Sequence, residues 1–323
     1  MTMQVRFWGT RGSLPKAMNA ASVENKIVTA LKAASGRTFA DDDAAAGFVR
    51  DELTFPQRGT YGGASSCVEI EPGGNEFVIC DMGSGLREFG LDSLGRIGNG
   101  SMEGTYHIFL SHPHWDHIMG FPFFVPAFNP NNIIKFYGGH DNIEAVLKRQ
   151  QENPSFPVPL EFMGAKREFV QLELGETYEI AGMTVSAKKQ HHHGDSFGYR
   201  FEKDGKVLVY STDAEHKLED PDEIESVVGF FNNADLLIMD TMYSLADAIS
   251  IKEDWGHSSN IVAVDLCHQA GVKHLAMFHH EPVYDDEMIF KVHGETLRYE
   301  EIMRGGSTPL TITCSYDGLE LDV

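Results

Sequence analysis

The chain has 323 residues and carries 26 Lys and Arg against 48 Asp and Glu, so its formal net charge is −22. This charge argues against an unaided nucleic-acid binder, because a phosphate backbone needs a basic footprint, and against a surface that binds anionic lipid. The hydrophobic content of 42%, with 21 Phe, predicts a folded protein with a large core. The sequence contains no run of about 20 apolar residues that could span a bilayer.

The N-terminal part predicts a strand, a helical insert and a hairpin. Residues 4–8 alternate as a strand does and run into a turn-rich loop at 9–13. Within 18–54, apolar residues recur at helical spacing on both sides of an Asp triplet, which predicts two short helices. Strands are then predicted at 66–70 and 76–80, joined by a turn at 72–74. Three roles stay open for the insert, namely a lid, a dimer contact that would make a homodimer, and packing against the body.

Strands and helices alternate in the remainder of the chain. Helices are predicted at 142–151 and 259–270, and strands at 106–110, 133–137, 183–187, 196–201, 206–210, 234–239, 272–278 and 311–314. The sequence has no internal repeat and no clear linker. A single α/β domain over 1–323, built on two sheets, is the resulting prediction.

Cysteine and histidine usage bears on compartment and chemistry. The four cysteines, Cys67, Cys80, Cys267 and Cys314, are far apart and form no CxxC pair. They predict buried thiols in a reducing compartment and no thiolate metal site. We therefore expect a cytoplasmic protein, since the first residues also lack a signal-peptide pattern. The 15 His, in contrast, are clustered, and imidazole with carboxylate is the ligand set of transition metals.

The densest histidine cluster is His112-Pro113-His114-Trp115-Asp116-His117, directly after a predicted buried strand. A chain that leaves a strand end can turn several of these side chains toward one point. Three further groups also lie at predicted strand ends: residues 190–195, 211–216 and 277–282. Each later group is weak by itself, but four such groups predict a metal site rather than a solvated histidine-rich loop.

Together with Asp81, His192, Asp213 and His279, this motif resembles the five-motif signature of the metallo-β-lactamase superfamily over about residues 4–290. The resemblance implies an αββα sandwich with two divalent metal ions at one edge of the sheets. It implies that His112, His114 and His192 hold the first ion, that Asp116, His117 and His279 hold the second, and that Asp213 bridges them. Asp81 matches a turn-forming position beside the ligands. Zinc suits these ligands best, and Mn²⁺ or Fe can occupy them.

Other residues resemble the dinuclear hydrolase branches, above all ribonuclease Z-like and cyclic-phosphate phosphodiesterase-like members. Asp240 and His257 match an acidic residue and a histidine that pair near the leaving group, although Glu is usual at the first position. The implied activity is hydrolysis of a small phosphodiester, such as a cyclic nucleotide or cyclic phosphate, by a hydroxide shared between the ions. Asp116, Asp240 and His257 are the predicted catalytic residues.

Several alternatives stay open. A thioesterase or lactonase of the same fold, or a ribonuclease Z-like nuclease, could use the same ligands, although the charge argues against a long nucleic acid as partner. Arg11 and His280 are candidate substrate contacts, and a plain surface Arg or a solvated His is the competing interpretation. Among His191, His192 and His193, the spacing to residues 198–200 favours His192 as the ligand.

Overall fold

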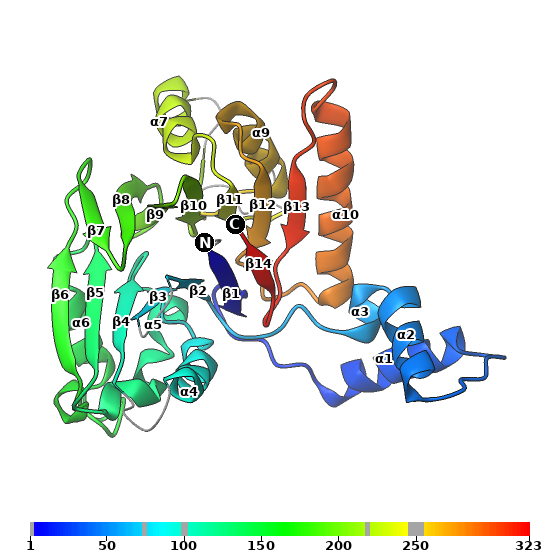
Figure 1. The fold of residues 1–323 in the computed structure, drawn as a ribbon, viewed down its shortest axis with the longest axis horizontal. Coiled ribbons are helices and arrows are strands. Elements are labelled where there is room, and N and C mark those ends of the chain that lie inside the picture. Colours follow the sequence, from blue (N-terminus) through cyan, green and yellow to red (C-terminus); the bar gives the residue numbers. More distant parts are fainter. Residues whose placement is uncertain (1–2, 73–75, 98–102, 217–219, 245–254) are drawn as a thin grey trace.

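Two β-sheets form the centre of the structure, which is a computed structural model that describes residues 3–72, 76–97, 103–216, 220–244 and 255–323. The first sheet contains β1 (Gln4–Gly9), β2 (Cys67–Glu71), β3 (Glu76–Cys80), β4 (Thr105–Phe109), β5 (Ile133–Gly138), β6 (Lys166–Gln171) and β14 (Glu320–Asp322). The second contains β7 (Thr177–Ile180), β8 (Met183–Gln190), β9 (Ser196–Lys203), β10 (Lys206–Ser211), β11 (Leu236–Asp240), β12 (His274–Phe278) and β13 (Thr311–Cys314). Among the described residues the strand orders are β14-β1-β2-β3-β4-β5-β6 and β13-β12-β11-β10-β9-β8-β7 (Figure 1).

Helices cover the outer faces of both sheets. The helices are α1 (Ala20–Ala33), α2 (Asp42–Glu52), α3 (Phe55–Arg58), α4 (Leu86–Arg96), α5 (Trp115–Ile118), α6 (Ile143–Gln150), α7 (Pro221–Phe231), α9 (Asn260–Ala270) and α10 (Asp286–Met303). Short 3-10 turns lie at Phe121–Phe123, Val125–Phe128 and Leu160–Phe162. A side-chain cap lies at the start of α1, α2, α7, α9 and α10. At α9, for example, the side chain of Ser259 accepts from the N–H of Val262.

Hydrophobic clusters separate four layers of secondary structure. One cluster lies between the two sheets and includes Phe7, Phe201 and Phe278. A second joins the first sheet to α4 and α6, and a third joins the second sheet to α7, α9 and α10. This arrangement is the αββα sandwich that the family resemblance implied, and it contains the two sheets predicted from the sequence pattern.

Most predicted elements are present, and several were missed. The strands predicted at 76–80 and 311–314 have the same bounds as β3 and β13, and β2 pairs with β3 as the predicted antiparallel hairpin, although residues 73–75 of its turn lie outside the described part. The elements that were not predicted from the sequence include α4, α7, α10, β6, β7 and β14. No helix of the described residues is long and apolar enough to cross a membrane.

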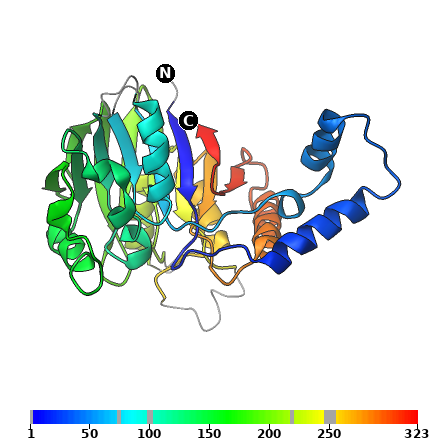
Figure 2. The ribbon, with the colours of Figure 1, turned by 90° about the horizontal axis from the view of Figure 1, so that it is seen from below.

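The insert forms the two predicted helices, but α1 does not pack on the body as its apolar stripe suggested. Figure 2 shows α1 and α2 as an arm that projects from the sandwich. No residue of α1 is buried, and Ile27 and Leu31 are exposed. At the base of the arm, Lys26 forms an ion pair with Asp286 of α10 at 2.8 Å. Packing against the body therefore does not explain the apolar residues of α1.

Parallel pairing places several strand ends at one edge of the sandwich. In the first sheet the ends of β3 and β4 are level, with Cys80 opposite Phe109. In the second sheet β11 is level with β12, and Asp240 lies opposite Phe278. Because the loops after parallel strands leave from the same edge, residues far apart in the sequence meet there.

Candidate metal centre

The predicted ligands come together at this edge in two groups. His112 and His114 follow β4 and His192 follows β8, and their ring nitrogens lie within 4.8 Å of one another. Nε2 of His192 lies 3.3 Å from Nδ1 of His114. The structure thus brings together the three side chains that the resemblance assigns to the first ion.

The second group contains Asp116, His117, Asp213 and His279, and it is fully buried. Nε2 of His117 lies 3.1 Å from Oδ2 of Asp116 and 3.2 Å from Oδ1 of Asp213. Nε2 of His279 lies 3.1 Å from the same Oδ1 of Asp213. Four donor atoms from three loops therefore surround one point.

Asp213 stands between the two groups. Its Oδ2 lies 3.6 Å from Nε2 of His112 and 3.7 Å from Nε2 of His192, whereas its Oδ1 faces His117 and His279. One carboxylate oxygen thus points toward each group. This is the geometry that a carboxylate shared by two cations requires.

Buried histidine nitrogens without hydrogen-bond partners indicate that these donor atoms suit divalent ions. Nε2 of His112 and Nε2 of His117 are buried and have no hydrogen-bond partner among the described residues. Buried polar nitrogens are normally paired, so two of them directed at neighbouring carboxylates indicate a position for a cation. Imidazole and carboxylate donors without thiolate suit Zn²⁺, Mn²⁺ or Fe.

Protonation states support the same conclusion for the first group. Burial lowers the pKa of His192 to about 4 and holds the pKa of His112 well below its usual range. Both rings are therefore neutral at pH 7, which is the form that binds a metal. Burial alone would raise the pKa of Asp116, but His117 and the bonds from His117 and His279 hold that pKa below its usual value.

Asp81 anchors the second group from behind. Its Oδ2 accepts from Nδ1 of His117 at 2.7 Å, from the hydroxyl of Tyr210 at 2.7 Å and from the hydroxyl of Ser111 at 2.8 Å. The bond from His117 leaves Nε2 of that ring free to face the ligand group. Carboxylates in this position orient metal-binding histidines and increase their basicity. Neither Tyr210 nor Ser111 was singled out in the sequence, although Ser111 directly precedes the motif.

Backbone strain and close approach also concentrate at the site. Asp81, Asp213 and His279 have φ values of 64°, 47° and 61°, in the left-handed region that L residues rarely adopt. A Cβ at Gly256, whose φ is +83°, would lie 2.4 Å from Nδ1 of His192. Nδ1 of His192 is 2.8 Å from the carbonyl of Gly256, so the glycine both admits and orients the ring.

Asp240 and His257 form the pair that the sequence predicted. Nδ1 of His257 lies 2.6 Å from Oδ2 of Asp240, and both residues belong to a donor group with Asp213 and His279. The ring of His257 stacks on that of His279 with centroids 5.2 Å apart. Burial lowers the pKa of His257, but Asp240 outweighs it, so the protein's own charges raise this pKa to about 9.

Two candidate substrate contacts face elsewhere. The guanidinium of Arg11 is buried and donates to the carbonyl oxygens of Gly62, Glu281 and Tyr284, which ties three loop positions together. His280 is also buried, and Nε2 donates to the carbonyl of Ser315 at 2.7 Å. Burial lowers the pKa of His280 to about 3, so its ring is neutral. The structure therefore corrects both expectations: these side chains hold the loops together.

A cavity of about 460 Å³ opens over the two groups. It is lined by Ser13, Pro113, His114, Trp115, Asp116, His192, His193, Asp213, Trp255 and His257. Of His191, His192 and His193, the donor group with His112 and His114 contains His192, while His191 and His193 are exposed. Ser13 was missed by sequence reasoning, because it acts through its backbone N–H, which donates to Oδ2 of Asp116 at 2.8 Å.

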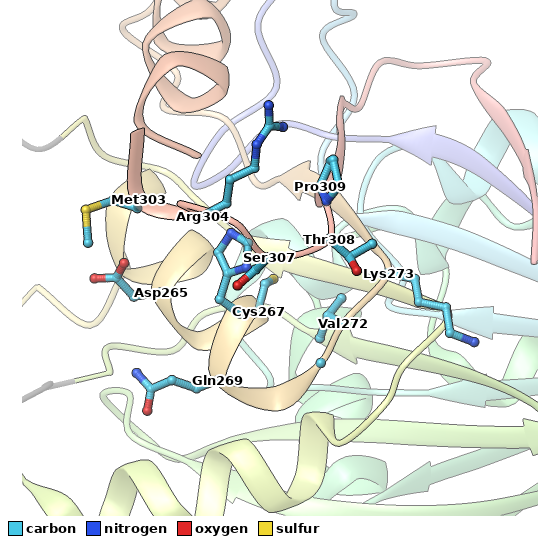
Figure 3. Close-up of a pocket in the computed structure, with 12 residues that line it drawn as sticks. Asp265, Cys267, Gln269, Val272, Lys273, Met303, Arg304, Ser307, Thr308 and Pro309 are labelled. Carbon is cyan, nitrogen blue, oxygen red and sulfur yellow. The ribbon is translucent and has the colours of Figure 1, made fainter. Parts of the chain in front are cut away.

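Another cavity, of about 760 Å³, lies where α9 ends and β12 begins (Figure 3). Arg304 and Lys273 line it, but Figure 3 shows their charged ends pointing away from one another. None of the ligand groups lines it.

Comparisons with known proteins agree with this geometry. A family model described as a beta-lactamase superfamily domain matches residues 79–280. Ribonuclease Z from Staphylococcus haemolyticus is 25% identical over 142 residues, so the chain spans only 42% of that relative's length. Ribonuclease Z from Oceanobacillus iheyensis is 24% identical over 232 residues, which cover 56% of this chain and 73% of that protein.

Solved structures show the same fold at low identity. The metallo-beta-lactamase fold protein YhfI from Bacillus subtilis superposes with a TM-score of 0.63 at 16% identity, covering 100% of this chain and 99% of that one. A diphosphatase from the PhnP family gives 0.61 at 18% identity, with 99% and 98% covered. Since the family model matches more than half of the chain, and the fold and ligand groups agree with it, this protein belongs to the metallo-β-lactamase superfamily.

Proposed function

We propose that this protein is a metal-dependent hydrolase that cleaves small phosphodiesters, such as cyclic nucleotides or cyclic phosphates. The observation that carries the proposal is the Asp240–His257 pair, with its 2.6 Å contact, beside the two ligand groups. Such a pair suits a phosphodiester, because its alkoxide leaving group must be protonated or its charge stabilised. His112, His114, His192 and Asp213 would hold one ion, and Asp116, His117, His279 and Asp213 the other.

The chemistry that two divalent ions supply when bound is Lewis acidity, which polarises a phosphoryl oxygen and acidifies water. The reaction consumes one water: a bond forms between phosphorus and the water oxygen, and the bond from phosphorus to the leaving oxygen breaks. The proton that the water loses passes to solvent, from which His257 regains a proton after turnover. His257 would give its Nε2 proton to that leaving oxygen. Asp240 would hold Nδ1 and stabilise the charged ring, which agrees with the raised pKa of His257, about 9 from the protein's own charges.

The charge distribution supports a small anionic substrate. The chain as a whole has a formal charge of −22, which opposes a long polyanion lying across its surface. Two divalent ions add about four positive charges at one point, and the carboxylates of Asp116 and Asp213 offset only part of them. A compact phosphodiester would thus meet a positive field at the cavity over the ligand groups.

An assay of three substrate classes tests this proposal. Purified, metal-loaded protein is offered bis(p-nitrophenyl) phosphate, a thioester and a lactone, and the same assays are repeated after chelation. We expect hydrolysis of the phosphodiester, with loss on chelation and recovery when metal is restored. Hydrolysis of the thioester or the lactone alone would reject a phosphodiesterase in favour of a thioesterase or lactonase.

A ribonuclease Z-like RNA-processing nuclease is the second candidate, because several curated relatives carry that name. The net charge argued against a long nucleic acid as partner, but relatives named as ribonucleases weaken that argument. The arm gives RNA little to bind, since Lys26, Lys32, Arg37 and Arg50 are outnumbered by acidic residues in 18–54. Cleavage of a precursor tRNA at higher kcat/KM than a cyclic nucleotide would favour this candidate.

A further inference from the structure

A third cavity lies beside α5 (Trp115–Ile118), the helix that carries Asp116 and His117 of the second ligand group. Its volume is about 530 Å³, within the range of roughly 300–1,000 Å³ that small-molecule sites span. Pro113 and Trp115 line both this cavity and the one over the ligand groups. On α5 itself, Asp116 and His117 are buried in the second ligand group, whereas Trp115 is exposed. The two cavities therefore adjoin at Pro113 and Trp115.

The walls of this cavity beside α5 are mostly aromatic and aliphatic. Trp115 is 78% exposed and Phe123 is 55% exposed, although both are large apolar side chains. Phe123 meets Phe156 edge to face, with ring centroids 5.6 Å apart and an interplanar angle of 89°. Ile118, Met119 and Val146 complete the apolar wall. Aromatic rings left open to solvent beside a polar site indicate a surface that a ligand covers.

Polar groups lie at one side of the cavity and would orient a ligand bound in it. Gln150 on α6 donates from Nε2 to the carbonyl of Ile118 at 2.8 Å, which ties α6 to the end of α5. Its Oε1 is buried without a hydrogen-bond partner among the described residues, a feature that a water or a ligand donor would satisfy. Arg149 is exposed at the same wall and forms no ion pair with any described residue. An occupant with a flat apolar face and polar edges matches this wall.

We propose that this cavity binds the planar aromatic part of the substrate, a nucleobase or a similar ring, while its phosphodiester lies at the ligand groups. The inference rests on the proposed function and narrows it from small phosphodiesters in general to those that carry an aromatic ring. Trp115, placed where the two cavities meet, would stack on the ring, and Phe123 and Phe156 would enclose its far edge. A phosphodiester of a simple diol would leave the cavity empty.

The first test compares ligands by binding, so that it does not depend on turnover. Adenosine 5′-monophosphate and ribose 5-phosphate carry the same phosphomonoester, and only the first carries a base. Calorimetric titration of the metal-loaded protein should show the nucleotide binding about tenfold more tightly, as expected from one base stacked on an aromatic side chain. Ser155→Trp, which fills the cavity from an exposed lining position, and Phe156→Ala, which opens it, should both reduce this preference.

The second test uses turnover, with the ratio of two substrates as readout. For the wild type, kcat/KM for a 2′,3′-cyclic adenylate should exceed that for glycerol 1,2-cyclic phosphate, and the ratio should fall about tenfold in Ser155→Trp. Phe162→Ala is the matched control, because Phe162 is exposed but does not line the cavity. This control should leave both the binding preference and the substrate ratio unchanged.

The outcomes separate the inference from the proposed function. Hydrolysis of both cyclic phosphates with equal binding of nucleotide and ribose 5-phosphate would overturn the aromatic subsite alone. Tighter nucleotide binding that depends on Ser155 and Phe156, without hydrolysis of any phosphodiester, would support the subsite and overturn the proposed function. A variant that fails to fold leaves the wild-type preference and the other variant to decide.

Discussion

Asp81 fixes the orientation of His117 through one short hydrogen bond, in which Nδ1 of the imidazole donates to Oδ2 of the carboxylate at 2.7 Å. The same carboxylate also accepts from the backbone N–H of Ser111 at 2.7 Å, so it is anchored to the loop that carries the ligands. Asp81 follows β3 and His117 lies beyond β4, so this bond connects two neighbouring strand ends. The metal centre thus depends on a residue that would itself contact no metal ion.

Asp81→Asn should weaken metal binding without removing a ligand. The amide can present an N–H toward Nδ1 of His117, which makes Nδ1 an acceptor and favours the tautomer that carries its proton on Nε2, the nitrogen that should bind the metal. Loss of such a supporting carboxylate typically costs about 10–100-fold in metal affinity or activity. Competition with a chromogenic chelator measures the affinity. Asp195→Asn, an exposed carboxylate near His192 in the sequence, is the control, and equal affinities for the two variants would contradict this role for Asp81.

Gly256→Ala should displace His192. The added Cβ would lie 2.4 Å from Nδ1 of that ring, so the imidazole must move out of the first ligand group. Gly182→Ala is a matched control, because Gly182 also has a positive φ, +70°, but no atom lies within 4 Å of its added Cβ. We expect metal analysis to show loss of one ion in Gly256→Ala and full occupancy in Gly182→Ala. Full occupancy in both would mean that His192 is not held by this glycine.

His257→Ala separates catalysis from metal binding. If His257 protonates the leaving oxygen, kcat should fall about 10²–10⁴-fold while both ions are retained. Asp240→Asn should also reduce kcat, because the carboxylate of Asp240 orients the ring of His257. A drop in metal content in His257→Ala would instead make His257 a ligand, since its nitrogen also lies within the donor group of Asp213 and His279.

Much of the fold could be predicted from the sequence, because buried strands have short apolar runs between turn residues. β3 and β13 were predicted to the residue. The 18-residue helix α10 was missed, since its apolar positions are diluted by charged ones and only part of one face is buried. β6 was missed for a similar reason: as an edge strand it has no fully buried position, so it lacks a clear alternation.

The residue types of the candidate site could be predicted from the sequence, but the contacts and burial of several side chains could not. Dense motifs at strand ends predicted a metal site, and the family resemblance implied which residues belong to each donor group. Arg11 and His280 could not be placed, since only the folded loops show that their nitrogens meet backbone carbonyls. The exposure of the apolar residues on α1 also required the structure, because helical spacing does not tell whether a partner surface exists.

Asp317→Asn should destabilise the fold without touching the ligands. Its Oδ2 accepts from the backbone N–H groups of Gly63 and Ala64, both at 2.9 Å, and its Oδ1 accepts from Thr10. An amide in this position presents an NH₂ group to two donors or loses bonds to Thr10. We expect a loss of about 1–3 kcal/mol in the free energy of unfolding by denaturant. Asp322→Asn is the control, because Asp322 is an exposed residue of β14, and it should change the free energy of unfolding by less than about 0.5 kcal/mol.

The bridging position of Asp213 is the central claim, because its two carboxylate oxygens face different donor groups. Metal content and hydrolysis of bis(p-nitrophenyl) phosphate, measured together on the wild type and on Asp213→Ala, test it most directly. The expected result is two ions per wild-type chain, with loss of both metal retention and turnover in a folded Asp213→Ala. Full activity of Asp213→Ala with no bound metal would contradict the account.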